Sequence, residues 1–367
     1  MNILHIYKDY FPVLGGIENH VRVLAEAQAA AGHQVTALVC DRGPRTRIVE
    51  MGGVRVVLAG RLRTVASMPI SLSQPWLAAR QRADVIHVHS PYPLGELSGW
   101  LLGRGAPLVI THHSDVVRQQ GWLRLYGPLL RFVLRRAGRI IATSPRYIET
   151  SPWLSPLRDK CVVIPLGVDA QRFVPPDRPF IGPPTLLFAG RLRYYKGLDT
   201  LLHALAELPG VTLNIVGDGP MLPALTALAQ ELGLSDRVCF LGEVDDDQLP
   251  GQYHRAHIFV LPANARAEAF GTVLLEAMAS GLPCVATEVG TGTSWVVRDS
   301  VTGRVVPPQN AAALASALSD LLVNPALCVR LGLAGRARVL AEFTQEKMVE
   351  RVLSAYQDVL RQRRQRA

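Results

Sequence analysis

The sequence contains few cysteines, and none is placed as a metal ligand. The five cysteines among 367 residues lie far apart and form no C-x-x-C pair. Neither a disulfide framework nor a cysteine-based zinc site is therefore expected. Four of the five lie in or beside apolar runs, where a small buried thiol is the common explanation. The cysteines are Cys40, Cys161, Cys239, Cys284 and Cys328.

Long apolar segments are also missing. The longest stretch without a charged residue, 64–79, has 16 residues and includes two prolines and three serines. A membrane-spanning helix needs a longer and more apolar segment. The chain opens on the strand-like "NILHIY" and not on the basic and apolar regions of a secretory signal peptide. We therefore expect a cytoplasmic protein, with a peripheral position at the inner face of the cell membrane left open.

The second half of the chain has no excess of positive charge, whereas the first half is basic. Residues 1–175 contain 21 Lys and Arg against 11 Asp and Glu, and residues 176–367 contain 18 against 19. A basic surface can face nucleic acid or an anionic membrane. Zinc-finger, RNP-like and compact helix-turn-helix motifs are absent, so we expect no nucleic acid partner. Lysine accounts for only four of the 39 basic residues, which makes each lysine position informative.

Short apolar runs alternate with amphipathic stretches along the chain, which predicts βαβ units and parallel sheets covered on both faces. The alternation stops at the proline-rich "RFVPPDRPFIGPPT" (172–185) and then restarts. The expected fold class is α/β, with two Rossmann-like, doubly wound domains and a ligand in the cleft between them, at the carboxyl ends of the strands. Strands are predicted at 2–7, 34–40, 54–59, 84–90, 107–114, 139–144, 185–190, 211–217, 237–242, 257–263 and 283–288. The predicted divisions are an N-terminal domain at 1–171, a linker at 172–184, a C-terminal domain at 185–344, and a helix at 345–367 that packs back toward the N-terminal domain.

Two adjacent glycines open the first predicted helix. In "YFPVLGGIENH", Gly15 and Gly16 leave backbone N–H groups and the positive end of the helix open to an anion. A tight strand-to-helix turn would explain the pair equally well. The dinucleotide fingerprint G-x-G-x-x-G does not occur, because "GDGPML" has Leu222 at the last glycine position, so NAD binding is not expected.

Charged pairs mark two places in the second half. "FAGRLRYYKGLDT" puts Arg191 directly after a strand and Lys196 at the start of the next helix. An Arg fork and a Lys point charge can neutralise a diphosphate, although a solvated loop would look the same. Farther on, "EAFGTVLLE" holds Glu268 and Glu276 eight positions apart, one before a helix and one inside it. From the residues alone, two surface glutamates flanking a helix would explain this spacing.

Five motifs in order carry a resemblance to a known family. "GGIE", "GRLRYYKG", "VGDGP", "FLGEV" and "EAFGTVLLEAMASGLPCVAT" together resemble the retaining glycosyltransferases of family 4, which have the GT-B fold. The resemblance runs essentially from end to end. It points to bacterial transferases that build O-antigen or exopolysaccharide, many of which move mannose-like sugars.

The resemblance implies a role for the two glutamates. Glu276 would hold the two ribose hydroxyls of the donor nucleotide, since a carboxylate can accept both hydrogen bonds of a vicinal diol. Glu268 would hold hydroxyls of the transferred sugar. Backbone N–H groups around Phe270, Gly271 and Thr272, at the helix N-terminus, would meet sugar hydroxyls and phosphate.

The resemblance also implies that Arg191 and Lys196 meet the diphosphate, with the Gly15–Gly16 turn opposite, and that Val244 lies near the base. His113, in "THHSD", matches a histidine that points into the cleft beside the reacting sugar; the alternative is a satisfied core histidine. Its neighbour His112 should point the other way if this segment is extended. The resemblance further implies that the acceptor proton passes to a donor phosphate oxygen, so no protein nucleophile is assigned.

No metal or other cofactor is expected beside the co-substrate, a GDP- or UDP-linked sugar. The run "DDD" (245–247) contains a D-x-D, which binds manganese in another transferase fold. Here it stands where a helix should begin, and helix capping with favourable dipole placement explains it. The cations and helix ends already supply the neutralising charge.

A basic amphipathic segment, "WLRLYGPLLRFVLRRAGR" (122–139), places Arg124, Arg131 and Arg135 along one helical stripe. Such a segment can lie on anionic lipid, or it can be a solvated helix face.

The expected function is transfer of a hexose, with a mannose-like sugar favoured, to a glycan or lipid-linked acceptor. The alternatives are a nucleotide-sugar 2-epimerase of the same fold and a non-catalytic, membrane-associated scaffold that binds nucleotides.

Overall fold

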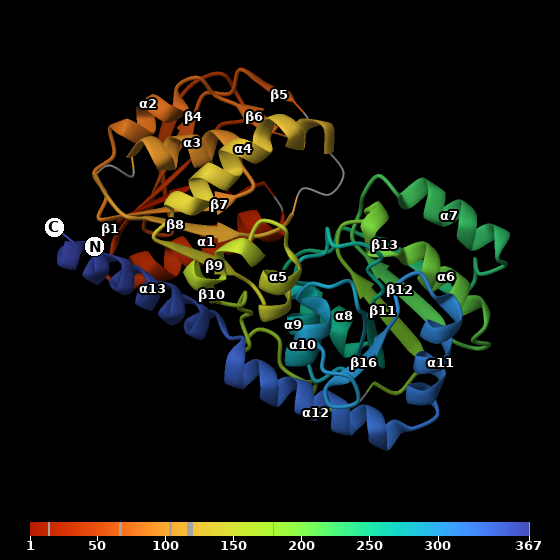
Figure 1. The fold of residues 1–367 in the computed structure, drawn as a ribbon. Coiled ribbons are helices and arrows are strands. Elements are labelled where there is room, and N and C mark those ends of the chain that lie inside the picture. Colours follow the sequence, from red (N-terminus) through yellow and green to blue (C-terminus); the bar gives the residue numbers. More distant parts are fainter. Residues whose placement is uncertain (14, 66–67, 103–104, 116–119, 179, 367) are drawn as a thin grey trace. The chain divides into compact units, whose positions relative to one another are not determined.

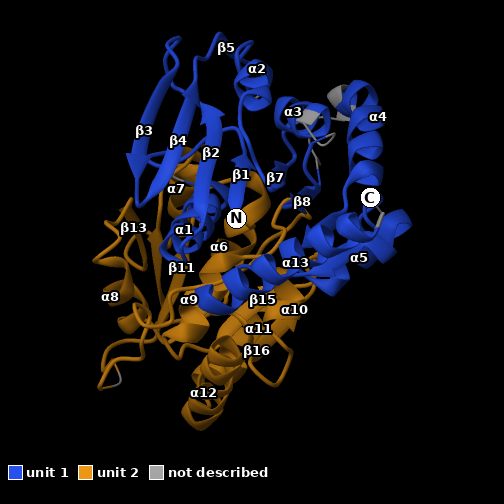
Figure 2. Ribbon diagram, turned by 90° about the vertical axis from the view of Figure 1, so that its left-hand side faces the viewer, with its two compact units in different colours: residues 1–166, 345–367 blue, residues 167–344 orange. Residues whose placement is uncertain are grey.

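The predicted apolar runs form the central sheets of two units (Figures 1 and 2). The computed structural model describes residues 1–13, 15–65, 68–102, 105–115, 120–178 and 180–366. Unit 1 comprises Met1–Leu166 and Gln345–Ala367, and unit 2 comprises Gly167–Thr344. The last helix thus belongs to unit 1, whereas the proline-rich segment 172–184 belongs to unit 2.

Unit 1 is built on a mostly parallel sheet. Its described strands follow the order β10-β9-β8-β7-β1-β2-β4-β3, and among them only β3 runs antiparallel to its neighbour. Strands β5 and β6 form a separate antiparallel ribbon. The strands are β1 (Asn2–Ile6), β2 (Gln34–Cys40), β3 (Arg47–Met51), β4 (Val54–Ala59), β5 (Arg63–Val65), β6 (Met68–Ile70), β7 (Val85–Ser90), β8 (Leu108–His112), β9 (Arg139–Ala142) and β10 (Cys161–Val163).

Side-chain alternation along these strands builds two apolar layers in unit 1. On β1, Ile3 packs in one cluster with Leu24 and Tyr356, whereas Leu4 packs in another cluster with Leu134. Successive strand residues point to opposite faces, so α1 and α13 cover one face and α2, α4 and α5 the other. The helical elements are α1 (Gly16–Ala30), α2 (Gln74–Ala79), α3 (Pro93–Leu102), α4 (Gln120–Arg136), α5 (Pro145–Thr150), η1 (Ser155–Lys160) and α13 (Gln345–Arg366).

Unit 2 is built on a parallel sheet whose described strands follow the order β13-β12-β11-β14-β15-β16. Helix α6 packs with α7 and α11, and α9 packs with α10 and α12. The strands are β11 (Thr185–Ala189), β12 (Thr212–Val216), β13 (Val238–Gly242), β14 (Ile258–Leu261), β15 (Cys284–Thr287) and β16 (Gly303–Val306). The helical elements are η2 (Tyr194–Lys196), α6 (Leu198–Ala206), α7 (Leu222–Glu231), α8 (Leu249–His254), α9 (Thr272–Ala279), α10 (Thr293–Val296), α11 (Ala311–Leu322) and α12 (Pro325–Glu342).

Every predicted run contains a strand, and the α/β prediction is confirmed. Sequence reasoning missed β3, an edge strand with charged residues, and the three-residue strands β5, β6 and β10. It also missed β16 at the edge of the second sheet. Among the described helices, none is by itself long and apolar enough to cross a membrane; α11 and α12 reach that level only jointly, and they are bent by 100°.

The cysteines are free thiols, as expected. Cys40 and Cys284 are buried, but Cys239 is exposed, so the prediction of a buried thiol was wrong there. The reason is its position on β13, the edge strand of the second sheet, where every second residue faces solvent.

Candidate active site

The predicted site residues of unit 2 lie at the carboxyl ends of its parallel strands. Arg191 follows β11, Val244 follows β13, and Glu268 follows β14. Lys196 ends η2 directly before α6, and Glu276 lies in α9. Loops at this edge of a parallel sheet are where such folds bind ligands.

Two glycines let these loops approach one another. Gly217, after β12, has a φ of 117°, and a Cβ there would overlap the carbonyl oxygen of Gly190. Gly197, between η2 and α6, has a φ of 69°, and a Cβ there would overlap the carbonyl oxygen of Pro262. Both positions need a residue without a side chain, because the backbones of neighbouring loops are in contact. The loop that carries Lys196 is therefore fixed against the loop after β14.

The structure brings Lys196 and Glu268 into an ion pair. Nζ of Lys196 lies 2.6 Å from Oε2 of Glu268, and each side chain is only 10% exposed. Burial alone would lower the pKa of Lys196, but the neighbouring Glu268 and Tyr195 more than offset this, so the pKa is raised above its usual value. Lys196 is therefore a buried, oriented positive charge at the carboxyl ends of the strands of unit 2.

Glu276 is held by a tyrosine that sequence reasoning missed. The hydroxyl of Tyr253, a buried residue of α8, donates a hydrogen bond to Oε2 of Glu276 at 2.6 Å. Burial raises the pKa of Glu276 to about 7, although the bond from Tyr253 and the charge of Arg172 oppose the shift. An isolated tyrosine in "GQYH" carries no sequence signal for this role, because the contact joins residues 23 positions apart.

The remaining predicted residues of unit 2 lie around this pair. Arg191 is exposed, and Val244 is half-buried. Phe270 is buried beside the start of α9. Gly271, with a φ of 82°, is the N-cap of α9, and Thr272 is its first residue. The backbone N–H groups of the helix start are thus where the sequence predicted them.

The acidic run 245–247 does not cap a helix as predicted. Helix α8 begins at Leu249, and its N-cap, Gln248, makes no side-chain capping bond. Asp246 instead contacts Arg172: Nη2 of the arginine lies 3.8 Å from Oδ1 of Asp246 and donates to its carbonyl oxygen. The capping interpretation was therefore wrong. Within the described residues, no group with metal-ligand geometry includes this run.

In unit 1, Gly15 is the N-cap of α1 and Gly16 its first residue, as predicted. A Cβ at Gly15 would overlap the carboxylate of Glu18, which lies 3.6 Å from Nζ of Lys8. The positive end of the helix thus already faces a carboxylate of the same chain. Anion binding at this turn stays a prediction.

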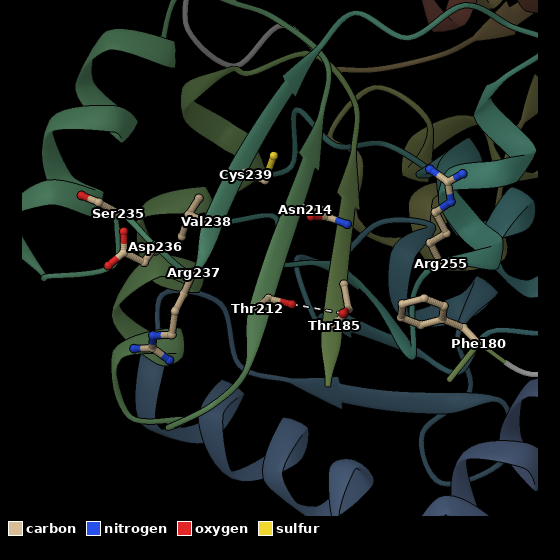
Figure 3. Close-up of a pocket in the computed structure, with 10 residues that line it drawn as sticks. All are labelled: Phe180, Thr185, Thr212, Asn214, Ser235, Asp236, Arg237, Val238, Cys239 and Arg255. Atoms are coloured by element: carbon tan, nitrogen blue, oxygen red, sulfur yellow. Dashed lines mark hydrogen bonds between the residues drawn. The ribbon is translucent and has the colours of Figure 1, made fainter. Parts of the chain in front are cut away.

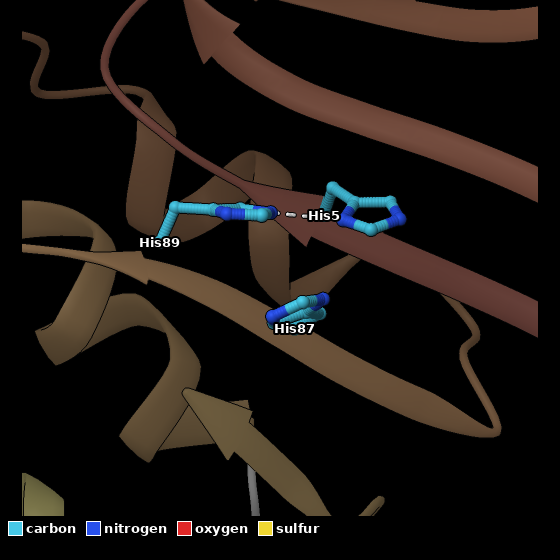
Figure 4. A group of neighbouring side chains, drawn as sticks. All are labelled: His5, His87 and His89. Atoms are coloured by element: carbon cyan, nitrogen blue, oxygen red, sulfur yellow. Dashed lines mark hydrogen bonds between the residues drawn. The ribbon is translucent and has the colours of Figure 1, made fainter. Parts of the chain in front are cut away.

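His113 belongs to a buried group of histidines in unit 1, part of which Figure 4 shows. His5 comes from β1, His87 and His89 from β7, and His20 from α1. Burial lowers the pKa of His5 to about 4 and that of His20 to about 3, and it lowers the pKa values of the other three well below the usual range. All five are neutral at pH 7. Sequence reasoning missed this group, although the spacing of two in "HVH" signals two histidines on one strand face.

His112 and His113 point to opposite faces of the sheet, and this prediction is confirmed. Nδ1 of His112 lies 3.1 Å from Oγ of Ser90, and its ring stacks on Tyr147. Nε2 of His113 lies 3.0 Å from Nδ1 of His89 on the other side. His113 is 4% exposed. Its two predicted roles, as a ligand-facing residue and as a satisfied core histidine, both stay open on this geometry.

The arginine stripe lies on α4. Arg124, Arg131 and Arg135 are all exposed. Leu125 and Phe132 are exposed on the same helix, by 77% and 42%. The helix therefore presents cations together with large apolar side chains, which is the composition of a helix at a lipid interface.

An open cavity of about 470 Å³ lies at the amino ends of the strands of unit 2 (Figure 3). Its lining includes Thr185, Thr212 and Val238, the first residues of β11, β12 and β13. Arg191, Val244 and Glu268 instead follow the last residues of β11, β13 and β14. The cavity is therefore separate from the site around Lys196 and Glu268.

Comparisons with known proteins cover nearly the whole chain. Residues 14–172 match the family model "Glycosyltransferase Family 4", and residues 174–338 match "Glycosyl transferases group 1". The chain is 38% identical to the D-rhamnosyltransferase WbpZ of Pseudomonas aeruginosa, over 94% of this chain and 92% of that protein. It is 34% identical to the O-antigen chain mannosyltransferase C of Escherichia coli, over 98% and 99%.

Among solved structures, the sucrose-phosphate synthase of Thermosynechococcus elongatus superposes with a TM-score of 0.83 at 28% identity, covering 98% of both chains. The likeness extends over both units. It confirms the predicted GT-B architecture.

Proposed function

Because the chain belongs to the family 4 glycosyltransferases and is a hexosyltransferase of the GT-B fold, we propose that it moves a mannose-like hexose from a nucleoside diphosphate sugar to a glycan or lipid-linked acceptor, with retention of the anomeric configuration. Two relatives support this choice of sugar and pathway: one is named a D-rhamnosyltransferase, and the other an O-antigen chain mannosyltransferase. D-Rhamnose is 6-deoxymannose, so both names point to the same ring stereochemistry.

The ion pair between Lys196 and Glu268 carries the proposal. Loss of a nucleoside diphosphate from the sugar increases the negative charge on the leaving oxygen. A cation that is already oriented stabilises that charge without reorganisation during the reaction. Lys196 is oriented by a 2.6 Å contact and by a backbone that only Gly197 permits. Arg191, on the same loop, adds an exposed guanidinium for the diphosphate.

The two glutamates bind different parts of the donor. Glu276, fixed by Tyr253, accepts hydrogen bonds from the ribose hydroxyls. Glu268 accepts hydrogen bonds from hydroxyls of the transferred sugar, and the N–H groups at Phe270, Gly271 and Thr272 meet its phosphate. The proton of the acceptor hydroxyl passes to an oxygen of the donor diphosphate. These roles need no cofactor and no metal ion.

We place the acceptor at the inner face of the cell membrane, with the protein in the cytoplasm. The exposed cations and apolar side chains of α4 support this placement. A lipid-linked acceptor would then reach the enzyme in the plane of the bilayer.

A donor screen tests the proposed function. The purified protein is incubated with GDP-, UDP- and ADP-linked mannose, rhamnose and glucose, with and without a lipid-linked glycan acceptor, and release of nucleoside diphosphate is followed. We expect release from one mannose-like donor, accelerated by the acceptor. Inversion at C2 of the sugar without an acceptor would identify the epimerase alternative. Tight nucleotide binding without release from any donor would identify the scaffold alternative.

A further inference from the structure

A chain of hydrogen bonds between buried side chains ends at His113 in unit 1. Oε1 of Gln28 lies 2.7 Å from Nε2 of His5, and Nδ1 of His5 lies 3.1 Å from Nε2 of His89, the bond drawn in Figure 4. Nδ1 of His89 lies 3.0 Å from Nε2 of His113. All four side chains are at most 4% exposed. Water therefore does not compete for these bonds.

Strand alternation brings these residues together. His5 pairs in register with His87, and His89 pairs in register with Thr111. Residues two apart on a strand share a face, so His89 lies on the face of His87, and His113 continues the face of Thr111. The helix α1, which supplies Gln28, covers this same face.

The bond partners determine where each proton lies. The amide oxygen of Gln28 can only accept, so Nε2 of His5 must donate to it. A neutral imidazole has one N–H, so Nδ1 of His5 accepts from Nε2 of His89, and Nδ1 of His89 accepts from Nε2 of His113. His113 is then left with a lone pair on Nδ1. Among the described residues, that nitrogen has no hydrogen-bond partner.

A second branch starts from the amide nitrogen of the same Gln28 side chain. Nε2 of Gln28 donates to the hydroxyl of Tyr356 at 3.4 Å, and that hydroxyl donates to Nδ1 of His87 at 2.5 Å. Nε2 of His87 then donates to Oγ1 of Thr111 at 2.7 Å. Each imidazole N–H and the hydroxyl proton of Tyr356 therefore have an acceptor, except at the His113 end of the chain, where Nδ1 carries no proton. Turning the amide of Gln28 round would reverse every bond, so this one side chain sets the direction of both branches.

Metal binding is the competing explanation for the histidine group. His5, His87 and His89, and likewise His20, His89 and His113, have ring nitrogens within 4.8 Å of one another. Metal ligands point their lone pairs at one common centre. The rings of His89 and His113 instead lie within 17° of one plane and meet end to end, with centroids 5.3 Å apart and nitrogens 3.0 Å apart. Both nitrogens of His89 are already engaged. The geometry favours a hydrogen-bond chain.

We propose that Gln28 is a positioning residue: through His5 and His89 it holds the proton of His113 on Nε2 and presents Nδ1 as an acceptor for a hydroxyl of the sugar substrate. The tautomer of His113 follows from these hydrogen bonds with the amide oxygen of Gln28 directed at His5. The identity of the bound hydroxyl rests on the proposed function. A neutral acceptor orients a hydroxyl without adding a charge to the site.

The tautomer is read directly by NMR of the ring nitrogens in the full-length protein labelled with ¹⁵N-histidine, with the His113 signals identified through His113→Gln. In the wild-type protein we expect a protonated Nε2 and an unprotonated Nδ1. Gln28→Met removes the acceptor and should give a mixture of tautomers. Gln28→Glu keeps an acceptor at the same point and should restore the wild-type pattern. Gln74→Met removes another buried glutamine of unit 1, bonded to Tyr92 and outside both branches, and should change nothing.

Turnover provides the second readout. Gln28→Met should lower kcat by about tenfold, the value of one hydrogen bond of ~1.4 kcal/mol, and Gln28→Glu should recover most of it. A wild-type His113 protonated on Nδ1, an unchanged tautomer in Gln28→Met, or one equivalent of zinc in the purified protein would each overturn the proposal. If the tautomers are as expected but no donor is turned over, the proposed function fails and the positioning role stands.

Discussion

Each unit buries a polar centre, and the two centres differ in charge. In unit 1, burial lowers the pKa of His5 and His89, and their hydrogen-bond partners are uncharged, so the rings are neutral. In unit 2, Lys196 is also buried but keeps its charge, because Glu268 lies 2.6 Å away. A buried group with neutral partners gives up its charge, whereas a group with a counter-ion retains it. The first centre can orient hydroxyls, and the second can stabilise a leaving anion.

The charged centre should dominate catalysis. Lys196→Ala removes the preoriented cation, and we expect turnover to fall by ~10²–10³, the loss typical of removing one such donor. Lys160→Ala, which removes a lysine bonded to backbone carbonyl oxygens of unit 1, should leave turnover near normal. Steady-state kinetics with the active donor measure both.

Lys196→Ala also leaves Glu268 buried without its partner, which can destabilise the fold. The double variant Lys196→Ala/Glu268→Gln removes that charge, and circular dichroism verifies folding. A folded Lys196→Ala protein with normal turnover would show that Lys196 has only a structural role. The proposed functional difference between the two centres would then be wrong.

Buried titratable groups of the two units should change the free energy of unfolding in opposite directions as pH rises. Glu276 provides the test in unit 2. Its native pKa of about 7 lies above the usual 4.5. Between these values the native state binds more protons, so the contribution of Glu276 to stability is lost as pH rises through this window. Glu276→Gln should therefore unfold with a free energy ~1–3 kcal/mol higher than wild type at pH 8, after allowance for partial exposure, and equal to it near pH 4. Glu231→Gln, at an exposed position, is the control for urea unfolding at both pH values.

His20 provides the corresponding test of pH-dependent stability in unit 1. Its native pKa of about 3 lies below the usual 6.5, so the unfolded state binds more protons in between, and stability is lost as pH falls from 6.5. Its Nε2 is buried without a hydrogen-bond partner among the described residues. His20→Leu should be more resistant than wild type to acid, by about 2 kcal/mol at pH 5 relative to pH 7.5. His203→Leu, at an exposed position on α6, serves as the control. Parallel pH dependence in wild type and His20→Leu would show that His20 is not held neutral.

The smallest effect concerns the surface of unit 1. If α4 meets anionic lipid, Arg131→Glu and Arg135→Glu should each weaken binding to vesicles containing phosphatidylglycerol by about 1 kcal/mol or more, and binding should fall with salt. Arg146→Glu reverses an exposed arginine on α5 and should have less effect. Vesicle sedimentation at two salt concentrations decides the matter. Salt-independent binding, or none at low salt, would leave α4 a solvated helix face.

Much of the fold followed from local patterns. The runs at 34–40 and 54–59 became β2 and β4 with the predicted bounds, because strands covered on both faces are almost continuously apolar. Edge strands such as β3 carry charged residues and lack this signal. The helix start at Gly271 was recognisable because it joins a glycine to an apolar helical pattern.

The side-chain contacts of the site were less accessible to sequence reasoning. Gln28, His89 and Tyr356 meet only because β1, β7, α1 and α13 are assembled, and no local pattern encodes contacts over 328 residues of separation. The acidic run at 245–247 shows the opposite failure. Its composition fits a helix cap, but the helix begins later, at Leu249. Asp246 forms an ion pair with Arg172 instead.

The central claim is that the chain transfers a sugar with retention, using its own cations on the leaving diphosphate. The most direct test follows the anomeric proton by ¹H NMR while the donor is consumed in the presence of EDTA. We predict a product with the same anomeric configuration as the donor, formed at the same rate with and without EDTA. An inverted product, or activity that EDTA abolishes and manganese restores, would contradict the account.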